Sequence, residues 1–160
     1  MEALALLKHL LTYDALTGQL TWTENARYTV AGKPAGTRDV LGYTYVRING
    51  KCYKAHRVAW ALAHDKLPSL AIDHINGDRS DNRLCNLREV SHRVNLQNQR
   101  HAQANNKASG LLGVSRHGSK WKARLKVENK RLYLGVFDTP EEAHQAYVQA
   151  KRTHHEGNTL

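Results

Sequence analysis

The 160-residue sequence predicts an α+β fold, and three local patterns lead to that prediction. Apolar residues at positions 3, 4, 6, 7, 10 and 11 have the spacing of an amphipathic helix. Alternation of cationic and apolar residues over 120–127 is the pattern of a strand with two different faces. The run Thr139-Pro140-Glu141-Glu142 combines an N-cap, a proline at the first helical position and a capping box. We therefore expect both helices and short strands along the chain.

Further elements are expected in the first hundred residues. The β-rich segment 43–48 is followed by Asn49-Gly50, the residue pair favoured in type I′ hairpins. This turn should return the chain antiparallel to the segment before it. The other expected elements are a strand through Leu20 and Trp22, the return strand at 51–55 and a short helix at 56–62 that ends before Pro68.

The pattern divides the chain into two modules, predicted as 1–104 and 105–160. Residues 105–110 lack any bulky apolar side chain and resemble a linker. In the second module we expect three strands followed by one helix. The cationic face of its sheet should carry Lys120, Lys122, Arg124, Lys126, Arg131 and Tyr133, and the buried face Trp121, Ala123, Leu125, Val127, Leu132, Leu134 and Val136. The helix should pack on that sheet through Ala143, Ala146, Tyr147 and Ala150.

The charge of the chain favours a polyanionic partner. There are 24 Lys and Arg against 14 Asp and Glu, a formal net charge of +10 and a pI near 9.8. The excess is local, because residues 107–136 hold eight lysines and arginines and a single acid, Glu128. An ordinary solvated strand surface is the alternative interpretation of such a charge run.

Cysteine usage and hydropathy exclude other classes of protein. Cys52 and Cys85 are not spaced as zinc ligands, so we expect no zinc site. No stretch approaches 18 apolar residues, and the apolar N-terminal run lacks a basic start and a cleavage site. We therefore expect a cytoplasmic protein with no membrane association.

The segment Asp73-His74-Ile75-Asn76-Gly77-Asp78 concentrates residues that carry chemistry. Adjacent residues on a strand point to opposite sides, so Asp73 can face a metal ion while His74 faces a water. A neutral histidine, with an ordinary pKa of about 6.5, can take a proton from that water. Carboxylate and amide oxygens suit a hard cation such as Mg²⁺. Asp, His, Asn and Gly are also common turn residues, which is the alternative interpretation of this segment taken alone.

Asn86 follows His74 by 12 residues, and Asn95 follows Asn86 by nine. With the adjoining runs 78–83 and 86–89 and the phrase 53–60, this spacing resembles the HNH nucleases, in the variant of phage-borne homing endonucleases that ends in Asn. The resemblance covers roughly 1–104 and implies a ββα-metal module. It implies that His74 is the general base, that Asp73 and Asn95 bind Mg²⁺ or Mn²⁺, and that Asn86 braces the loop and orients His74.

Two further histidines lie near this motif. If 91–103 form a helix, His92 shares a face with Asn95, and we expect it to contact DNA or to support the site. His56 lies close to Val58 and Trp60, which favours a packed or DNA-contacting residue over a catalytic one.

The second module resembles the DNA-binding domain of plant ethylene-response factors. The matching residues are Ser109-Gly110, Gly113-Val114, Trp121, 134–139, 141–143 and Tyr147. The resemblance implies that the sheet lies in the major groove of DNA. The DNA-binding residues expected from it and from the cationic face are Arg116, Trp121, Lys122, Arg124, Lys126, Arg131 and Tyr133.

Together these features predict a metal-dependent endonuclease acting on double-stranded DNA, with a separate recognition module and no evident obligate protein partner. The resemblance implies a phage homing enzyme working in the cytoplasm of a bacterial host. A DNA-binding regulator that retains the nuclease fold without catalysis is one alternative. An RNA-binding or RNA-cleaving protein is another, because Trp121 and Tyr133 could stack on unpaired bases.

Overall fold

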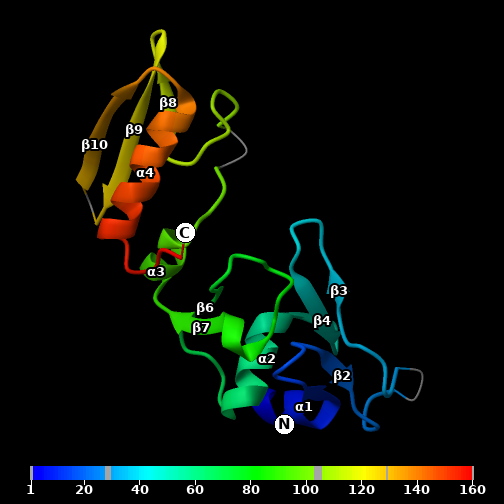
Figure 1. Cartoon of the computed structure of the whole chain (residues 1–160). Helices are drawn as coiled ribbons and strands as arrows, with labels where there is room; N and C mark the ends of the chain where they lie inside the picture. Colours follow the sequence, from blue (N-terminus) through cyan, green and yellow to red (C-terminus); the bar gives the residue numbers. More distant parts are fainter. Residues whose placement is uncertain (1, 28–29, 103–105, 129, 160) are drawn as a thin grey trace. The chain divides into compact units, whose positions relative to one another are not determined.

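The computed structural model describes residues 2–27, 30–102, 106–128 and 130–159 (Figure 1). Its contacts divide the chain into two compact units, Met1–His92 and Arg93–Leu160. The linker expected at 105–110 begins among residues outside the described ranges, and the contacts join 93–102 to the second unit. The fold class is confirmed, because small antiparallel sheets are combined with helices in both units.

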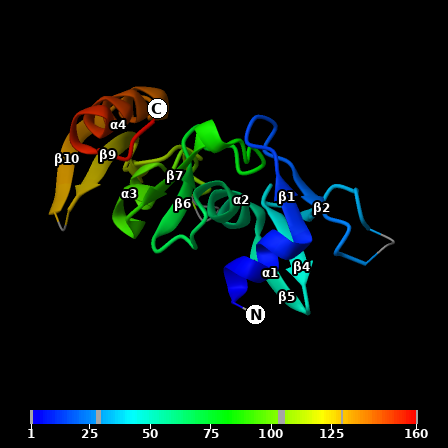
Figure 2. The same cartoon turned by 90° about the horizontal axis from the view of Figure 1, so that it is seen from below.

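The first unit contains three two- or three-stranded sheets and two helices. In chain order its elements are α1 (Ala3–Leu10), β1 (Leu11–Tyr13), β2 (Leu20–Trp22), β3 (Thr37–Arg38), β4 (Thr44–Ile48), β5 (Lys51–Lys54), α2 (Ala55–His64), β6 (Ala71–His74), the 3₁₀ turn η1 (Leu84–Asn86) and β7 (Leu87–Val90). The sheets are β1-β2, β3-β4-β5 and β6-β7, all antiparallel. Figure 2 shows α1 lying against α2.

The hairpin predicted at Asn49-Gly50 is confirmed. Both residues have positive φ, 49° and 78°, as a type I′ turn requires. The turn pairs β4 with β5 so that Val46 and Ile48 point into the core. That core holds Leu7, Leu11, Leu20, Ala35, Ala55 and Val58, and a second cluster under β6-β7 holds Ala59, Trp60, Ile72 and Leu87.

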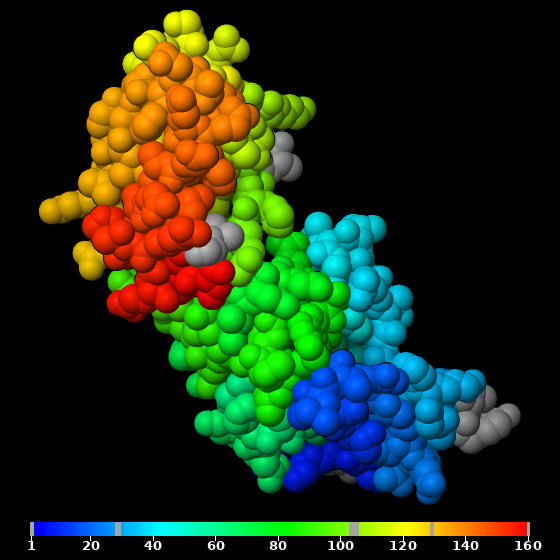
Figure 3. All heavy atoms as spheres, in the orientation of Figure 1, coloured from blue at the N-terminus to red at the C-terminus, as the bar shows by residue number. Residues whose placement is uncertain are grey.

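The second unit has one sheet covered by one long helix. Its elements are α3 (His92–Gln97, beginning at the last residue of the first unit), β8 (Val114–His117), β9 (Lys120–Val127), β10 (Lys130–Phe137) and α4 (Pro140–His154). The sheet order is β10-β9-β8, and α4 packs across one face of it. In Figure 3 the atoms of α4, orange to red, occupy the near surface of this unit.

Helix α4 begins as its sequence predicts. Thr139 accepts a hydrogen bond from the backbone of Glu142, whose side chain accepts one from Thr139 in return, and Pro140 opens the helix. Close packing explains Gly113, since a Cβ there would come within 1.9 Å of the Tyr147 ring. Glycine therefore lets the chain pass directly over the helix.

Two expectations about β10 are wrong. The register shifts between Tyr133 and Gly135, so Val136 pairs with Lys122 and lies on the cationic face. Leu132 pairs with buried Leu125 and so lies on the expected face, but it is 39% exposed rather than buried. An irregularity of one residue reverses the alternation after it, and a regular sequence pattern does not reveal it.

Helix α3 is shorter than the segment 91–103 considered above. It ends at Gln97, and the next two amides bond back only three residues, to the carbonyls of Asn95 and Leu96. The end of α4 and the segment after it pack against α3 and the residues that follow it. The Gly157 amide donates to Gln97 Oε1 at 3.0 Å, and Lys151 Nζ of α4 donates to the Gln99 carbonyl. Thus α3 is held by residues that follow it by more than fifty positions.

The described helices include none that is long and apolar enough to cross a bilayer. Cys52 and Cys85 are both exposed free thiols.

Candidate active site

Strands β6 and β7 place Asp73 and His74 on opposite faces, as predicted. Asp73 pairs with Arg88, and His74 pairs with Leu87. The face with Leu87 and Ile72 is the one that packs on Ala59 and Trp60 of α2, so His74 points toward that helix. Asp73 and His74 are only 7% and 5% exposed. The two central residues of the motif therefore occupy separate, largely buried environments.

His74 is held by a neighbouring amide. Its Nε2 lies 3.1 Å from Asn82 Oδ1, and since a carboxamide oxygen only accepts, Nε2 is the donor. Burial lowers the pKa of His74 below its ordinary value, although the Asn82 hydrogen bond and nearby carboxylates oppose this. The ring is therefore neutral near pH 7, which is the state a general base requires.

A second histidine lies directly against it. The His56 ring is 4.8 Å from the His74 ring, centroid to centroid, at an interplanar angle of 76°. His56 is 4% exposed, and its Nδ1 is buried with no hydrogen-bond partner among the described residues. Burial, followed by the proximity of His74, lowers the pKa of His56 to about 3. These surroundings are those of a packed, permanently neutral histidine.

Asn86 ties together the loop between β6 and β7. Its Oδ1 accepts from the Asn76 amide at 2.9 Å, and its Nδ2 donates to the Asp81 carbonyl at 2.8 Å. Its own carbonyl accepts from the Ile75 amide at 2.8 Å. These are the contacts of a residue that braces the loop, whereas the His74 ring donates its hydrogen bond to Asn82.

Asn82 is a site residue that sequence reasoning missed. It is buried, and its carbonyl accepts a 2.8 Å hydrogen bond from the hydroxyl of Tyr13, far away in the sequence. Burial raises the pKa of Tyr13 to about 12, so the hydroxyl remains a donor. A Cβ on Gly18 would lie 2.5 Å from the Arg83 amide nitrogen, so the turn between β1 and β2 packs directly against this loop. The only sequence signal was the position of Asn82 inside the 78–83 run.

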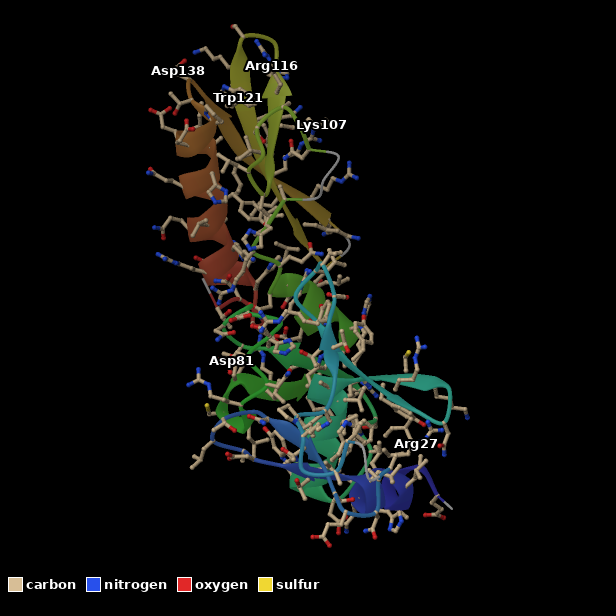
Figure 4. The ribbon with its side chains drawn as sticks, turned by 90° about the vertical axis from the view of Figure 1, so that its right-hand side faces the viewer. Arg27, Asp81, Lys107, Arg116, Trp121 and Asp138 are labelled. Atoms are coloured by element: carbon tan, nitrogen blue, oxygen red, sulfur yellow. The ribbon has the colours of Figure 1, made fainter. Side chains whose placement is uncertain are left out.

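An acidic and a basic residue fix the outer part of the same loop. Arg83 donates to both carboxylate oxygens of Asp81, at 2.8 and 2.7 Å, and Asn76 Nδ2 donates to Asp81 Oδ2 at 2.9 Å. The Arg83 hydrogen bonds lower the pKa of Asp81 to about 2. Asp81, labelled in Figure 4, therefore stays ionised and holds its loop.

Asp73 offers the type of donor that Mg²⁺ prefers. Arg88 Nε and Nη2 both donate to its Oδ2, at 3.0 and 2.8 Å, which fixes the orientation of the carboxylate. Within the described ranges, no three His, Cys, Asp or Glu residues gather as a metal cluster. An oxygen ligand of this kind fits a hard cation that retains several waters.

Asn95 and His92 both lie on α3. Asn95 belongs to the second unit, while Asp73 and His74 belong to the first. The shared metal site of Asp73 and Asn95, and a supporting role for His92, remain predictions.

The residues expected to form a cationic face in the second unit do lie together on one face of its sheet. The cross-strand pairs Lys126–Arg131 and Arg124–Tyr133 place these four residues, with Lys122, on the face of the sheet opposite α4. All are exposed except Lys122, which is half-buried.

Arg116 and Trp121 lie on the other face. They pair with each other across β8 and β9, on the side of Val114 and Ala123, which is covered by α4. The Arg116 guanidinium lies 5.7 Å from the Trp121 ring, and Figure 4 shows the two side chains together near one end of the sheet. Their predicted DNA contacts would therefore come from a different side of the sheet than those of Arg124.

Comparison with known proteins gives two matches. One solved structure, described as "DNA binding and cleavage by the HNH homing endonuclease I-HmuI", is similar with a TM-score of 0.44 and 16% identity, over 92% of this chain and 88% of that chain. No curated protein matches the chain. Residues 53–97, which contain His56, Asp73, His74, Asn82 and Asn86, match the sequence model of the HNH endonuclease family.

Proposed function

We propose that this protein is a metal-dependent endonuclease that hydrolyses phosphodiester bonds in duplex DNA. The observation that carries the proposal is the buried, neutral His74, fixed by Asn82 and adjacent in sequence to the buried carboxylate of Asp73. The match of residues 53–97 to the HNH endonuclease family supports a DNA-cleaving hydrolase.

In this proposal His74 removes a proton from the attacking water, because its neutral imidazole is held in one orientation by Asn82. Asn86 keeps the loop between β6 and β7 in the shape that positions Asn82. General-base catalysis supplies about 10²- to 10⁴-fold, which is far less than phosphodiester hydrolysis requires. Electrostatic stabilisation must supply much of the remainder.

Asp73 and Asn95 are the proposed ligands of Mg²⁺ or Mn²⁺. When bound, the ion would stabilise the charge that develops on the phosphate. Arg88 holds the Asp73 carboxylate in place beforehand. These two ligands, one carboxylate and one amide oxygen, leave coordination positions on the ion for water and for a phosphate oxygen.

The cationic face of the second unit is the proposed DNA-recognition surface. Arg124, Lys126 and Arg131 present positive charge on a sheet whose other face is covered by α4. Two DNA-binding parts on one chain raise the effective concentration of the nuclease at neighbouring DNA. We propose a phage homing enzyme, acting in the bacterial cytoplasm without an obligate protein partner, as the biological setting.

The decisive experiment is cleavage of supercoiled DNA carrying the gene's flanking region, with Mg²⁺ or with chelator. We expect nicking or linearisation that needs the metal and is lost in His74→Ala. His9→Ala, which removes an exposed histidine on α1, should cleave like the parent protein. Equal cleavage by the parent and His74→Ala would refute the assignment of His74 as the base.

One observation favours a second candidate. Asp73, a proposed metal ligand, is already ion-paired with Arg88, an arrangement that also suits a DNA-binding regulator without catalysis. Tight binding of the same DNA without cleavage, in Mg²⁺ and in Mn²⁺, would favour that regulator.

A further inference from the structure

Tyr43 lies beside the two buried histidines, although no sequence pattern pointed to it. Its ring centroid is 5.6 Å from that of His56 and 6.2 Å from that of His74. The preceding turn is fixed by Asp39 Oδ1, which accepts from the amides of Leu41 and Tyr43, each at 2.9 Å. Tyr43 is half-buried, so its ring reaches from the histidine pair to the surface.

Two cationic side chains lie over this ring. Lys54 Nζ is 4.8 Å and Arg79 Cζ is 4.9 Å from the ring centroid. Lys54 closes β5, and Arg79 comes from the loop after β6, where it also donates to the Leu41 carbonyl at 3.3 Å. Three separate segments of the first unit therefore converge to place two positive charges on the ring that lies beside His56 and His74.

Lys54 and Arg79 differ from the other cationic side chains near the site in their ion pairing. Arg83 and Arg88 are engaged by the carboxylates of Asp81 and Asp73. In the described part of the chain, the ion pairs include neither Lys54 nor Arg79. Both side chains are exposed. Their charge is thus available to an anion that approaches the Tyr43 ring from solvent.

We propose that Lys54 and Arg79, held on the Tyr43 ring, bind DNA phosphates next to the bond that His74 attacks. This inference rests on the proposed function and assigns the contacts that seat the scissile strand. Both charges lie close to one ring centroid, while phosphates on one strand follow every ~3.4 Å of helix axis. The pair therefore fits phosphates that are near neighbours on the strand. The aromatic ring aligns the cations, since its face attracts positive charge.

The test is the salt dependence of duplex DNA binding by the full chain in chelator. Each phosphate contact contributes about 0.9 to the slope of log K against log salt. We expect Lys54→Met and Arg79→Met each to reduce the slope by about that amount. Tyr43→Phe keeps the ring and should keep the slope, whereas Tyr43→Leu should reduce it. Lys51→Met removes an exposed lysine of the same strand, on the opposite face of the hairpin, and should leave the slope unchanged.

Unchanged slopes in both Lys54→Met and Arg79→Met would overturn the inference. An equal loss in Lys51→Met would also overturn it, because net charge alone would then explain the effect. Binding in chelator does not require cleavage, so this result is separate from the nuclease assignment. If the parent protein fails to cleave while the two slopes fall, the phosphate contacts stand and only the nuclease proposal is lost.

Discussion

His56 and His74 meet edge to face in the first unit, with ring centroids 4.8 Å apart, and both rings are buried. Burial lowers the pKa of both rings, and the proximity of His74 lowers that of His56 further. Burial therefore keeps His74 neutral, while Asn82 holds its ring in one orientation. The side chains around the pair, among them Tyr43 and Asn82, come from distant parts of the sequence.

Replacing Asn82 should impair catalysis more than folding. Asn82→Ala removes the acceptor of the His74 Nε2 hydrogen bond, so the ring loses its fixed orientation. Misplacing a reacting group costs about 10²-fold in rate, and we expect a loss of that order in single-turnover cleavage. Asn82→Asp keeps an acceptor oxygen and should recover part of the activity. Equal rates for Asn82→Ala and the parent protein would show that the orientation of His74 comes from elsewhere.

Replacing Asn86 should destabilise the first unit. Asn86→Ala leaves the Asn76 amide and the Asp81 carbonyl without their present partner. Each of these two half-buried hydrogen bonds contributes about 0.5–1.5 kcal/mol, so urea unfolding should show a combined loss of about 1–3 kcal/mol. Asn86→Asp preserves the acceptor for Asn76 and should lose less. If Asn86→Asp loses as much unfolding free energy as Asn86→Ala, the hydrogen bond to the Asn76 amide does not contribute separately.

Stability should fall in mild acid because of His56. Its pKa is about 3 in the folded chain and near 6.5 when unfolded, so the unfolded state binds the extra proton between these values. The stabilisation is therefore complete above pH 6.5 and declines toward pH 3, by about 1.4 kcal/mol per pH unit at most. Unfolding free energies measured across this window should fall less steeply in His56→Phe. Parallel curves for the two proteins would rule out His56 as the cause.

The two faces of the β10-β9-β8 sheet should differ in DNA binding. Arg124→Met, Lys126→Met and Arg131→Met should each reduce the slope of log K against log salt by about 0.9. Arg116→Met removes a charge from the face that α4 covers and should change the slope less. The comparison uses duplex DNA in chelator. A larger effect of Arg116 than of the other three would assign recognition to the opposite face.

Local features of the fold were predictable because their chemistry is contained in a few neighbouring residues. The turn at Asn49-Gly50 and the capping box at Thr139 depend on backbone conformations that only certain residues favour. The alternation in β9 likewise produced one buried and one cationic face, as expected. Sequence patterns failed at the register shift after Tyr133, since one extra residue leaves no separate signature.

The candidate site was predictable only in part for a similar reason. The separation of Asp73 and His74 to opposite faces follows from strand geometry alone. The partners of His74 come from elsewhere: Asn82 from the following loop, and His56 and Tyr43 from earlier segments. Such contacts depend on tertiary packing. The face of the sheet on which Arg116 lies can be inferred only from the strand register. Its charge alone placed it in the same predicted DNA-binding set as Arg124.

The packing of α3 has an evolutionary consequence. Gln97 and Gln99 accept hydrogen bonds from Gly157 and Lys151, so the residues around Asn95 pack with the end of α4 and the segment after it. Recombination at residues 105–110 would give α3 a foreign neighbour and break these contacts. Exchange of recognition parts between related genes should therefore preserve α3 together with the segment that follows α4. Substitutions at Val94 and Gly157 are accordingly expected to be inherited as a pair.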